Sequence, residues 1–580
     1  MSSLQKIAFT LIVCLFAAVC VGGVIAAETG VRSPAGAPPD CSGGVVYSLA
    51  PTYVPYTGIP VSSPSEPTDP NETTNLTVTR TALGAVTEHS PWGNQTHIND
   101  ISPDRRHCAS VFPTEDGQGI MLDGNTGKSY EQVEGQVFTP DSKHLGYRAE
   151  AEGKWFVVVD GKEGKPYDLI GRESPVFSPD STRVAYTGIS VASGQQACIV
   201  VDGVEGKWYP VVDKLVFSPD SKHVAYFTRI GPVVLGKPDI IVSGSIVVDD
   251  KEVRQFDDVG DFVFSPDSAH WACVIKVGKQ YLVVQDGVDG QPYGWIIVPP
   301  IFSPDSKHMV YVAGSEGKWI VVLDGVESKK YESIEYGHIG AFPLQALQPV
   351  FSPDSQHLAY VAKEENKHFI VRDGVEGKQY SKSVSWPVFS PDSKHLAYYA
   401  NDGDGDCIVQ DGVDGTKYMT VKGLKYSPDS SRLAYGARTR DGWCVVVNNV
   451  EGKKYRGILP SSTHDTGIMF SADSKRMIYV AQPNDGQCVL VADGVEGKEY
   501  RGVSALAVSP DGNHVAYIAS DGKRNFYVVD GTEICDPEEK PVNGLIFDSP
   551  TKCHGIVQRA STAYLIEIEI APQGGLQESP

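Results

Sequence analysis

Cysteine and positive charge are both scarce in this chain of 580 residues. Its eleven cysteines are too few for a disulfide-stapled scaffold. The 50 Lys and Arg residues face 72 Asp and Glu residues, so the formal net charge is -22. Because nucleic acids and anionic membrane surfaces require a basic footprint, this deficit argues against either as the main partner.

Signatures of catalysis are also missing from the sequence. It has no G-x-S-x-G elbow, no H-E-x-x-H pair, no phosphate-binding loop and no C-x-x-C. What is abundant is turn chemistry, with 59 Gly and 39 Pro, and 41% hydrophobic residues are enough to build a core. This composition excludes wholesale disorder and favours a turn-rich, all-β chain.

The N-terminus is predicted to be a targeting segment. An apolar run, Ile7 to Val24, follows a short region with one lysine, and small residues precede Glu28. This pattern is typical of a signal peptide over residues 1–27, cleaved after Ala26 or Ala27, and it predicts a secreted or periplasmic protein. A run of about 18 residues is also long enough to span a bilayer, so an uncleaved membrane anchor stays open.

The next segment, residues 28–79, is predicted to be a linker. Nine prolines lie among Ser, Thr, Ala and Gly between residues 33 and 70. Such a composition cannot bury enough apolar surface to fold by itself, so we expect an extended tether.

A repeated unit of the form FSPDSKHLAYVA dominates the rest of the chain. Length alone would predict three or four domains. The repeat replaces that estimate, because twelve units follow one another at intervals of 37 to 49 residues. The positions of their turn proline, with alanine in one slot, are 103, 140, 179, 219, 266, 304, 353, 391, 428, 472, 510 and 550.

Columns within the unit predict four short antiparallel strands. The fourth residue after the proline is His or Arg in all twelve units, and the seventh is Tyr in nine. An apolar run then ends in Asp-Gly, and Gly-Lys-x-Tyr closes most units. Ser-Pro-Asp-Ser predicts a tight turn between the first two strands, and Asp-Gly predicts a hairpin between the last two. Four antiparallel strands at this period indicate blades of a β-propeller.

The unit, which stands as FSPDSQHLAYVA at residues 351–362, resembles the WD-repeat-like blade of the TolB family. The resemblance covers residues 80–571 and implies a β-propeller fold. The chain departs from that family in having about twice the number of blades and no obvious separate N-terminal α/β domain. TolB's partners are therefore not carried over, since one fold hosts many functions.

Twelve blades exceed the four to eight of an ordinary ring, so the sequence favours two six-bladed propellers in tandem. The widest spacing, 49 residues between Pro304 and Pro353, follows the sixth unit. Propeller 1 is then expected over 80–340, propeller 2 over 341–571 and a tail over 572–580. Seven plus five blades, or one large ring, are the alternatives.

The histidine and cysteine columns are interpreted as structural. A metal centre needs ligands that converge on one ion, whereas these histidines are distributed one per blade. Cys198, Cys407 and Cys444 share one third-strand column in different blades, so we expect buried core residues rather than disulfides. Cys535 and Cys553 flank the last hairpin region, and a disulfide between them stays open.

The clearest metal-like segment is Asn-Asp-Gly-Asp-Gly-Asp at residues 401–406. Asp402, Asp404 and Asp406 offer alternating carboxylates, which are ligands that calcium prefers. The segment departs from an EF-hand loop, which requires glycine where Cys407 stands and glutamate where Val413 stands. The alternative is an acidic hairpin turn between two strands of one blade.

Sequence variation between units concentrates at one end of the blades. The Ser-Pro-Asp-Ser turns and Asp-Gly hairpins lie at one end and are nearly uniform, whereas the opposite turns and the blade-to-blade connections differ. The longest variable segments are 229–245, 189–196, 334–347 and 459–467. Since binding residues usually lie on variable loops of a rigid scaffold, we expect the partner to bind this face.

These observations predict an exported, non-catalytic propeller that binds a protein or glycan of the cell envelope or extracellular space. The rival hypothesis is a propeller enzyme that acts on sugars or lactones with a metal in its central funnel. Three or more His, Asp or Glu residues converging on a ring axis would favour the enzyme. A third hypothesis is a structural spacer at the cell surface.

Overall fold

A computed structural model describes residues 76–85, 100–192, 195–230, 243–334, 348–459 and 467–571. All of these lie within one compact unit, residues 66–580. In these ranges every regular element is a β-strand, as predicted. The predicted signal peptide, most of the linker and the tail over 572–580 lie outside the described residues. No described segment forms a helix that could cross a membrane.

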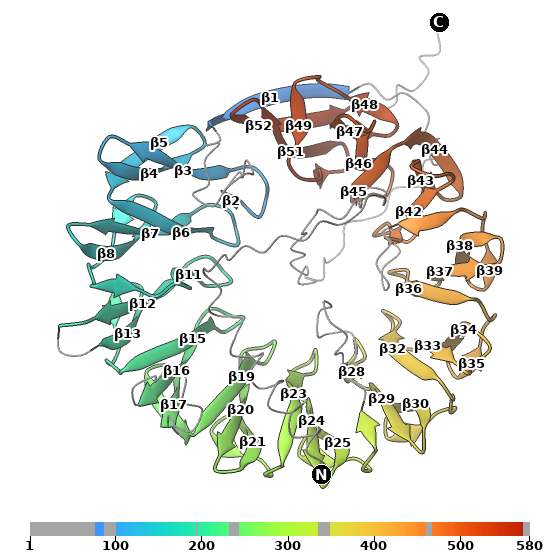
Figure 1. The fold of residues 1–580 in the computed structure, drawn as a ribbon, viewed down its shortest axis with the longest axis horizontal. Coiled ribbons are helices and arrows are strands. Elements are labelled where there is room, and N and C mark those ends of the chain that lie inside the picture. Colours follow the sequence, from blue (N-terminus) through green and yellow to red (C-terminus); the bar gives the residue numbers. More distant parts are fainter. Residues whose placement is uncertain are drawn as a thin grey trace, which may run out of the picture. The chain divides into compact units, whose positions relative to one another are not determined.

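The described strands form twelve antiparallel sheets, one for each repeat unit, and we number these blades in chain order (Figure 1).
Blades 1 to 4 are formed by β2 (Asp100–Ile101), β3 (Cys108–Thr114), β4 (Gly117–Leu122) and β5 (Asn125–Tyr130); β6 (Gln132–Phe138), β7 (Leu145–Ala151), β8 (Lys154–Val159) and β9 (Lys162–Glu163); β10 (Leu169–Ile170), β11 (Val176–Phe177), β12 (Val184–Ser190), β13 (Gln196–Val201) and β14 (Val204–Glu205); and β15 (Val211–Phe217), β16 (Val224–Ile230), β17 (Ser243–Val248) and β18 (Lys251–Phe256).
Blades 5 to 8 are formed by β19 (Asp258–Phe264), β20 (Trp271–Val277), β21 (Gln280–Gln285) and β22 (Val288–Asp289); β23 (Trp295–Phe302), β24 (Met309–Ser315), β25 (Lys318–Leu323) and β26 (Val326–Glu327); β27 (Ser333–Ile334), β28 (Val350–Phe351), β29 (Leu358–Glu364), β30 (Lys367–Arg372) and β31 (Val375–Glu376); and β32 (Ser383–Phe389), β33 (Leu396–Asn401), β34 (Asp406–Gln410) and β35 (Val413–Asp414).
Blades 9 to 12 are formed by β36 (Thr420–Tyr426), β37 (Leu433–Thr439), β38 (Gly442–Val447) and β39 (Val450–Glu451); β40 (Gly457–Leu459), β41 (Met469–Phe470), β42 (Met477–Gln482), β43 (Cys488–Ala492) and β44 (Val495–Tyr500); β45 (Gly502–Val508), β46 (Val515–Ser520), β47 (Asn525–Val529) and β48 (Thr532–Ile534); and β49 (Glu539–Pro541), β50 (Ile546–Ser549), β51 (Lys552–Arg559), β52 (Thr562–Ile570) and β1 (Leu76–Ala85).

The repeated histidine ties two turns of each blade together. In blade 2, His144 Nδ1 lies 2.6 Å from Asp160 Oδ2, and the backbone N–H of Leu145 donates to Asp160 Oδ1 at 3.0 Å. Asp160 and Gly161 both have positive φ, +49° and +76°, as a two-residue hairpin of type I′ requires. The predicted structural role of the histidine column is therefore confirmed here. The same contact joins His107, His223, His270, His308, His357, His395 and His514 to the aspartate of their own blade.

Successive blades are joined by a repeated pair of polar contacts. The backbone N–H of Asp180 in blade 3 donates to Ser221 Oγ of blade 4 at 2.9 Å, and this bond recurs at the other interfaces from blade 1 to blade 10. At the hairpin end, Lys165 and Tyr167, which close blade 2, both donate to Glu205 in strand β14 of blade 3 at 2.7 Å. Buried apolar side chains fill the space between sheets, and burial there stabilises the stack.

The prediction of two six-bladed propellers, divided at residues 340 and 341, is corrected by these contacts. Blade 6 packs on blade 7 like the other neighbouring pairs from blade 1 to blade 10, and the Asp305 N–H donates to Ser355 Oγ at 3.0 Å. Blade 12 closes on blade 1, where Arg105 donates to the carbonyl of Gly544 at 2.5 Å and His554 Nε2 lies 2.6 Å from the carbonyl of Asp104. The blades therefore form one ring of twelve, the alternative that the sequence left open (Figure 1).

The last blade takes its outer strand from the N-terminal side of the propeller. β1 pairs antiparallel with β52, with Leu76 opposite Ile570, in the order β1-β52-β51-β49. Leu76 and Val78 pack against the apolar core of blade 12. Residues 76–79, predicted as the end of the linker, therefore belong to a strand. Alternation of apolar residues with threonine, which suits a half-buried strand, is the pattern that marks them.

Candidate functional site: a basic crevice between blades 9 and 10

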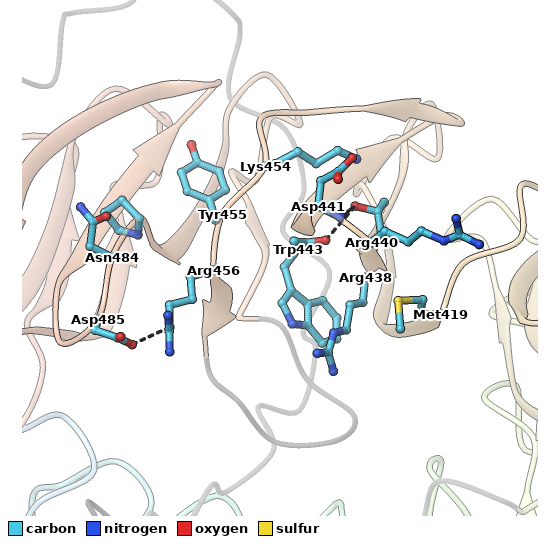
Figure 2. Close-up of a pocket in the computed structure, with 13 residues that line it drawn as sticks. Met419, Arg438, Arg440, Asp441, Trp443, Lys454, Tyr455, Arg456, Asn484 and Asp485 are labelled. Atoms are coloured by element: carbon cyan, nitrogen blue, oxygen red, sulfur yellow. Dashed lines mark hydrogen bonds and ion pairs between the residues drawn. The ribbon is translucent and has the colours of Figure 1, made fainter.

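A crevice of about 760 Å³ opens between blades 9 and 10, at the variable end of the blades. β37 follows the Ser-Pro-Asp-Ser turn of blade 9 and is seven residues long, ending at Thr439. The crevice is lined by the turn that follows, by the connection after Tyr455, and by the hairpin of blade 10 at Pro483 to Asp485 (Figure 2). At about 3.4 Å per residue, the six steps from Leu433 to Thr439 separate the crevice from the uniform turns by roughly 20 Å.

An aromatic pair forms one wall of this crevice. Trp443 and Tyr455 exchange two backbone hydrogen bonds of 2.7 Å, and Arg438 is the direct partner of Trp443 on the neighbouring strand. Tyr455 is buried against Tyr479 of blade 10, and this burial raises the pKa of its phenol. Trp443 is half-buried, and the ammonium group of Lys422 lies 4.6 Å from its ring centroid.

Gly442 allows the strands to approach at this point. Its φ is +134°, and a Cβ atom there would lie 2.4 Å from the carbonyl oxygen of Tyr455. Any side chain would push the closing strand away from Trp443. The shape of the crevice therefore depends on this glycine.

Positive charge exceeds negative charge around the crevice. Arg438, Arg440, Lys454 and Arg456 line it, against Asp441 and Asp485. Arg456 Nε pairs with Asp485 at 2.5 Å, and Lys454 pairs with Glu451 at 2.6 Å. Although burial opposes it, the hydrogen bond to Glu451 helps to raise the pKa of Lys454.

Arg438 and Arg440 differ from these two cations. Both side chains are exposed, and neither forms an ion pair with another residue of the described ranges. Figure 2 shows Arg438 beside the Trp443 indole, Arg456 on the other side toward Asp485, and Arg440 pointing away from the indole. Two guanidinium groups are thus available to a ligand.

No family model matches the chain, and no curated protein matches it. One similar solved structure is a eukaryotic initiation factor, with 12% sequence identity and a TM-score of 0.30; the match covers 58% of this chain and 92% of that one. A second is TolB from Acinetobacter baumannii, with 12% identity and a TM-score of 0.21; the match covers 47% of this chain and 78% of that one. A third is the β-propeller domain of the Trilobed protease from Pyrococcus furiosus, with 12% identity and a TM-score of 0.22; the match covers 49% of this chain and 94% of that one. The propeller fold of this chain rests on its own strand pairing.

The arrangement around the crevice supplies binding groups. Guanidinium groups donate in a planar fork that matches carboxylate, sulfate or phosphate oxygens, and the indole offers a flat apolar surface. The neighbouring thiol, Cys444, is buried, and burial raises its pKa, so it is a poor nucleophile. Among the described residues, no group of three or more His, Cys, Asp or Glu is placed to hold a metal ion.

The predicted calcium ligands are not brought together. Asp402 accepts a hydrogen bond from the Ser381 N–H at 2.9 Å, which lowers its pKa. Asp404 pairs with Lys417 at 2.6 Å, and Asp406 accepts from Asn401 at 2.6 Å. The three carboxylates thus have separate partners in the acidic hairpin between β33 and β34, and calcium at this turn stays a prediction.

The cysteines of the third strands are buried, as predicted. Cys198, Cys407 and Cys444 are free thiols in β13, β34 and β38, and burial is the main cause that raises the pKa of Cys198 to about 12. Cys535 is exposed and Cys553 is buried, and both are free. The disulfide that the sequence left open between them is not formed in this structure.

Sequence reasoning missed the Arg438–Trp443 pair. Trp443 begins the apolar run of its unit, and such a run by itself predicts only a strand. This column is often aromatic, and each member bridges to the closing tyrosine of its blade: Trp155, Tyr281, Trp319 and Trp443. A basic residue directly opposite the aromatic one, as at Arg438, is the signal that could have found the site.

Proposed function

We propose that this protein is an exported, non-catalytic β-propeller that binds a protein or glycan partner of the cell envelope or extracellular space. The crevice between blades 9 and 10 is its contact site. The observation that carries the proposal is a pair of arginines, Arg438 and Arg440, that form no ion pair within the described residues and lie near a half-buried tryptophan at the variable end of the blades. Export is inferred from the N-terminal sequence alone.

The rest of the scaffold supports a binding role through rigidity. The same serine and lysine contacts recur from blade to blade, so the strands that carry the crevice are held on both sides. A rigid scaffold lowers the entropic cost of binding, because little ordering is required when the partner arrives.

A blocking substitution in the full-length protein tests this proposal. Asn484→Trp places a bulky side chain on an exposed crevice residue, and Gln356→Trp makes the same change at an exposed residue of a uniform turn. Both are screened against a glycan array and a panel of envelope proteins. We expect the partner of the wild-type protein to be lost with N484W and retained with Q356W. Equal capture by all three proteins would refute the crevice as the contact site.

A further inference from the structure

We infer that the ligand of this crevice is an acidic glycan, held through its carboxylate or sulfate groups by Arg438 and Arg440 and through a sugar face by Trp443. The inference rests on the proposed function and adds the chemical class of the partner.

The basic character of the crevice is local. The equivalent hairpins of blades 6, 7 and 8 carry acids: Glu316, Glu364, Glu365, Asp402 and Asp404. At blade 9 the hairpin carries Arg438 and Arg440 instead, and Arg456 follows in the next connection. In a chain of net charge -22, a basic site is not expected from bulk composition. Its field would draw an anionic ligand to this part of the variable face.

The other interblade crevices of the described residues contain fewer cations that lack an ion pair there, namely Arg501 between blades 10 and 11 and Arg172 between blades 3 and 4. A crevice of about 370 Å³ between blades 10 and 11 contains Lys498 and Arg524, but they pair with Glu533 and Asp521. In most blades the repeated lysine of the closing segment likewise pairs with a carboxylate. Arg438 and Arg440 therefore differ from the structural cations of the repeat.

Trp443 favours a glycan over an acidic peptide. Carboxylates of a peptide would need only the guanidinium groups, whereas a sugar ring also presents an apolar C–H face. Such a face is attracted to the negative face of an indole. The volume of about 760 Å³ also lies in the range of pockets for whole ligands, and it exceeds the space that one carboxylate requires.

The test uses the full-length protein and four polymers: polygalacturonate and heparin as acidic glycans, dextran as a neutral glycan, and poly-L-glutamate as an acidic peptide. We expect both acidic glycans, or the one with the preferred acid group, to bind in calorimetry, and dextran not to bind. R438Q/R440Q should weaken this binding by about tenfold or more, because two charge-assisted contacts are lost. K307Q/K394Q removes the same charge from exposed lysines of the uniform turns and should leave binding unchanged.

A second variant separates the glycan from the peptide. Trp443→Leu should weaken acidic-glycan binding. Thermal unfolding of the variant serves as the control and should show that the propeller is still folded. Should W443L fail to fold, the wild-type preference for acidic glycan over poly-L-glutamate decides the question. Equal binding of poly-L-glutamate, binding of dextran, or equal losses with K307Q/K394Q would each overturn the inference.

The two proposals fail in different ways. A partner that N484W blocks but R438Q/R440Q still binds would refute the acidic-glycan inference and support the crevice as a contact site. A partner that neither variant affects would refute both.

Discussion

Closure of the ring by β1 can be tested through one ion pair. Arg80 Nε lies 2.6 Å from Glu539 Oε1, and Arg80 Nη2 lies 3.0 Å from Oε2, so the two groups form a bidentate pair between β1 and β49. The side chain of Glu539 is only 6% exposed, and that of Arg80 is 32% exposed. Arg80→Met would leave a buried carboxylate without its partner.

The cost follows from this burial. Removing one partner of a fully buried ion pair costs about 3–5 kcal/mol. Because Arg80 is partly exposed to solvent, we expect a smaller loss of about 2–3 kcal/mol. At about 1.4 kcal/mol for each factor of ten, local opening of the closing strands becomes roughly 30- to 150-fold more frequent.

Hydrogen exchange measured on peptides from β1, β52 and the other blades is the suitable assay, since a long repeat array need not unfold in two states. Exchange in Thr562–Ile570 should accelerate in R80M and recover in R80M/E539M, which leaves no unpaired charge. The control is R559M, which breaks the exposed Arg559–Glu538 pair of the same blade and should cost about 0–1 kcal/mol.

Two results would refute this reasoning. If β52 exchanged at the wild-type rate in R80M, the pair would not hold the last blade closed. If the acceleration appeared in blade 6 instead, β1 would close a smaller ring, as the two-propeller hypothesis requires.

Three further predictions concern the turns of the blades. Ser306 has a φ of +64°, and its hydroxyl accepts a hydrogen bond from the Asp267 N–H, so S306A should lower the free energy of unfolding by about 1–3 kcal/mol. S306G places glycine where blade 11 naturally has Gly512; because glycine suits positive φ, it should lower that free energy by less when denaturant midpoints are compared. The hydrogen bond to Asp530 raises the pKa of His514 above 6.5, although burial opposes this shift. The His514–Asp530 pair therefore contributes fully to stability below pH 6.5, and this contribution is lost as the pH rises through the folded-state pKa. H514Q should reduce the pH dependence of hydrogen exchange in blade 11. Because the carboxylates of Asp402, Asp404 and Asp406 have separate partners, added calcium should not raise the melting temperature. If calcium did raise the melting temperature of the wild-type protein but not that of D404N, the calcium prediction would be restored.

The blades themselves were predictable because their determinants are local. Turn residues, the apolar alternation and the Asp-Gly hairpin all act within about 40 residues, and the pattern is repeated twelve times. The contact of His144 with Asp160 is likewise local, so its structural role could be inferred from its column.

The number of blades in a ring and the crevice could not be predicted in this way. Blades 6 and 7 meet through the same chemistry as the other neighbouring pairs from blade 1 to blade 10, so no residue marks whether a ring closes there. The partner of β1 lies at the far end of the propeller, and no local pattern identifies it. Trp443 stands in an apolar column, and only the cross-strand pairing with Arg438 distinguishes a crevice wall from a core residue.

The pairing of β1 with β52 also determines the order of folding. Leu76 is synthesised 570 - 76 = 494 residues before its partner Ile570, whereas contacts between neighbouring blades join segments about 40 residues apart. Blades can therefore stack during synthesis, but the ring closes only after the last strand has been made. Until then, the ten-residue β1 presents an unpaired edge, which is a template for pairing with other chains. Premature termination or slow release should thus produce association between chains rather than an open monomer.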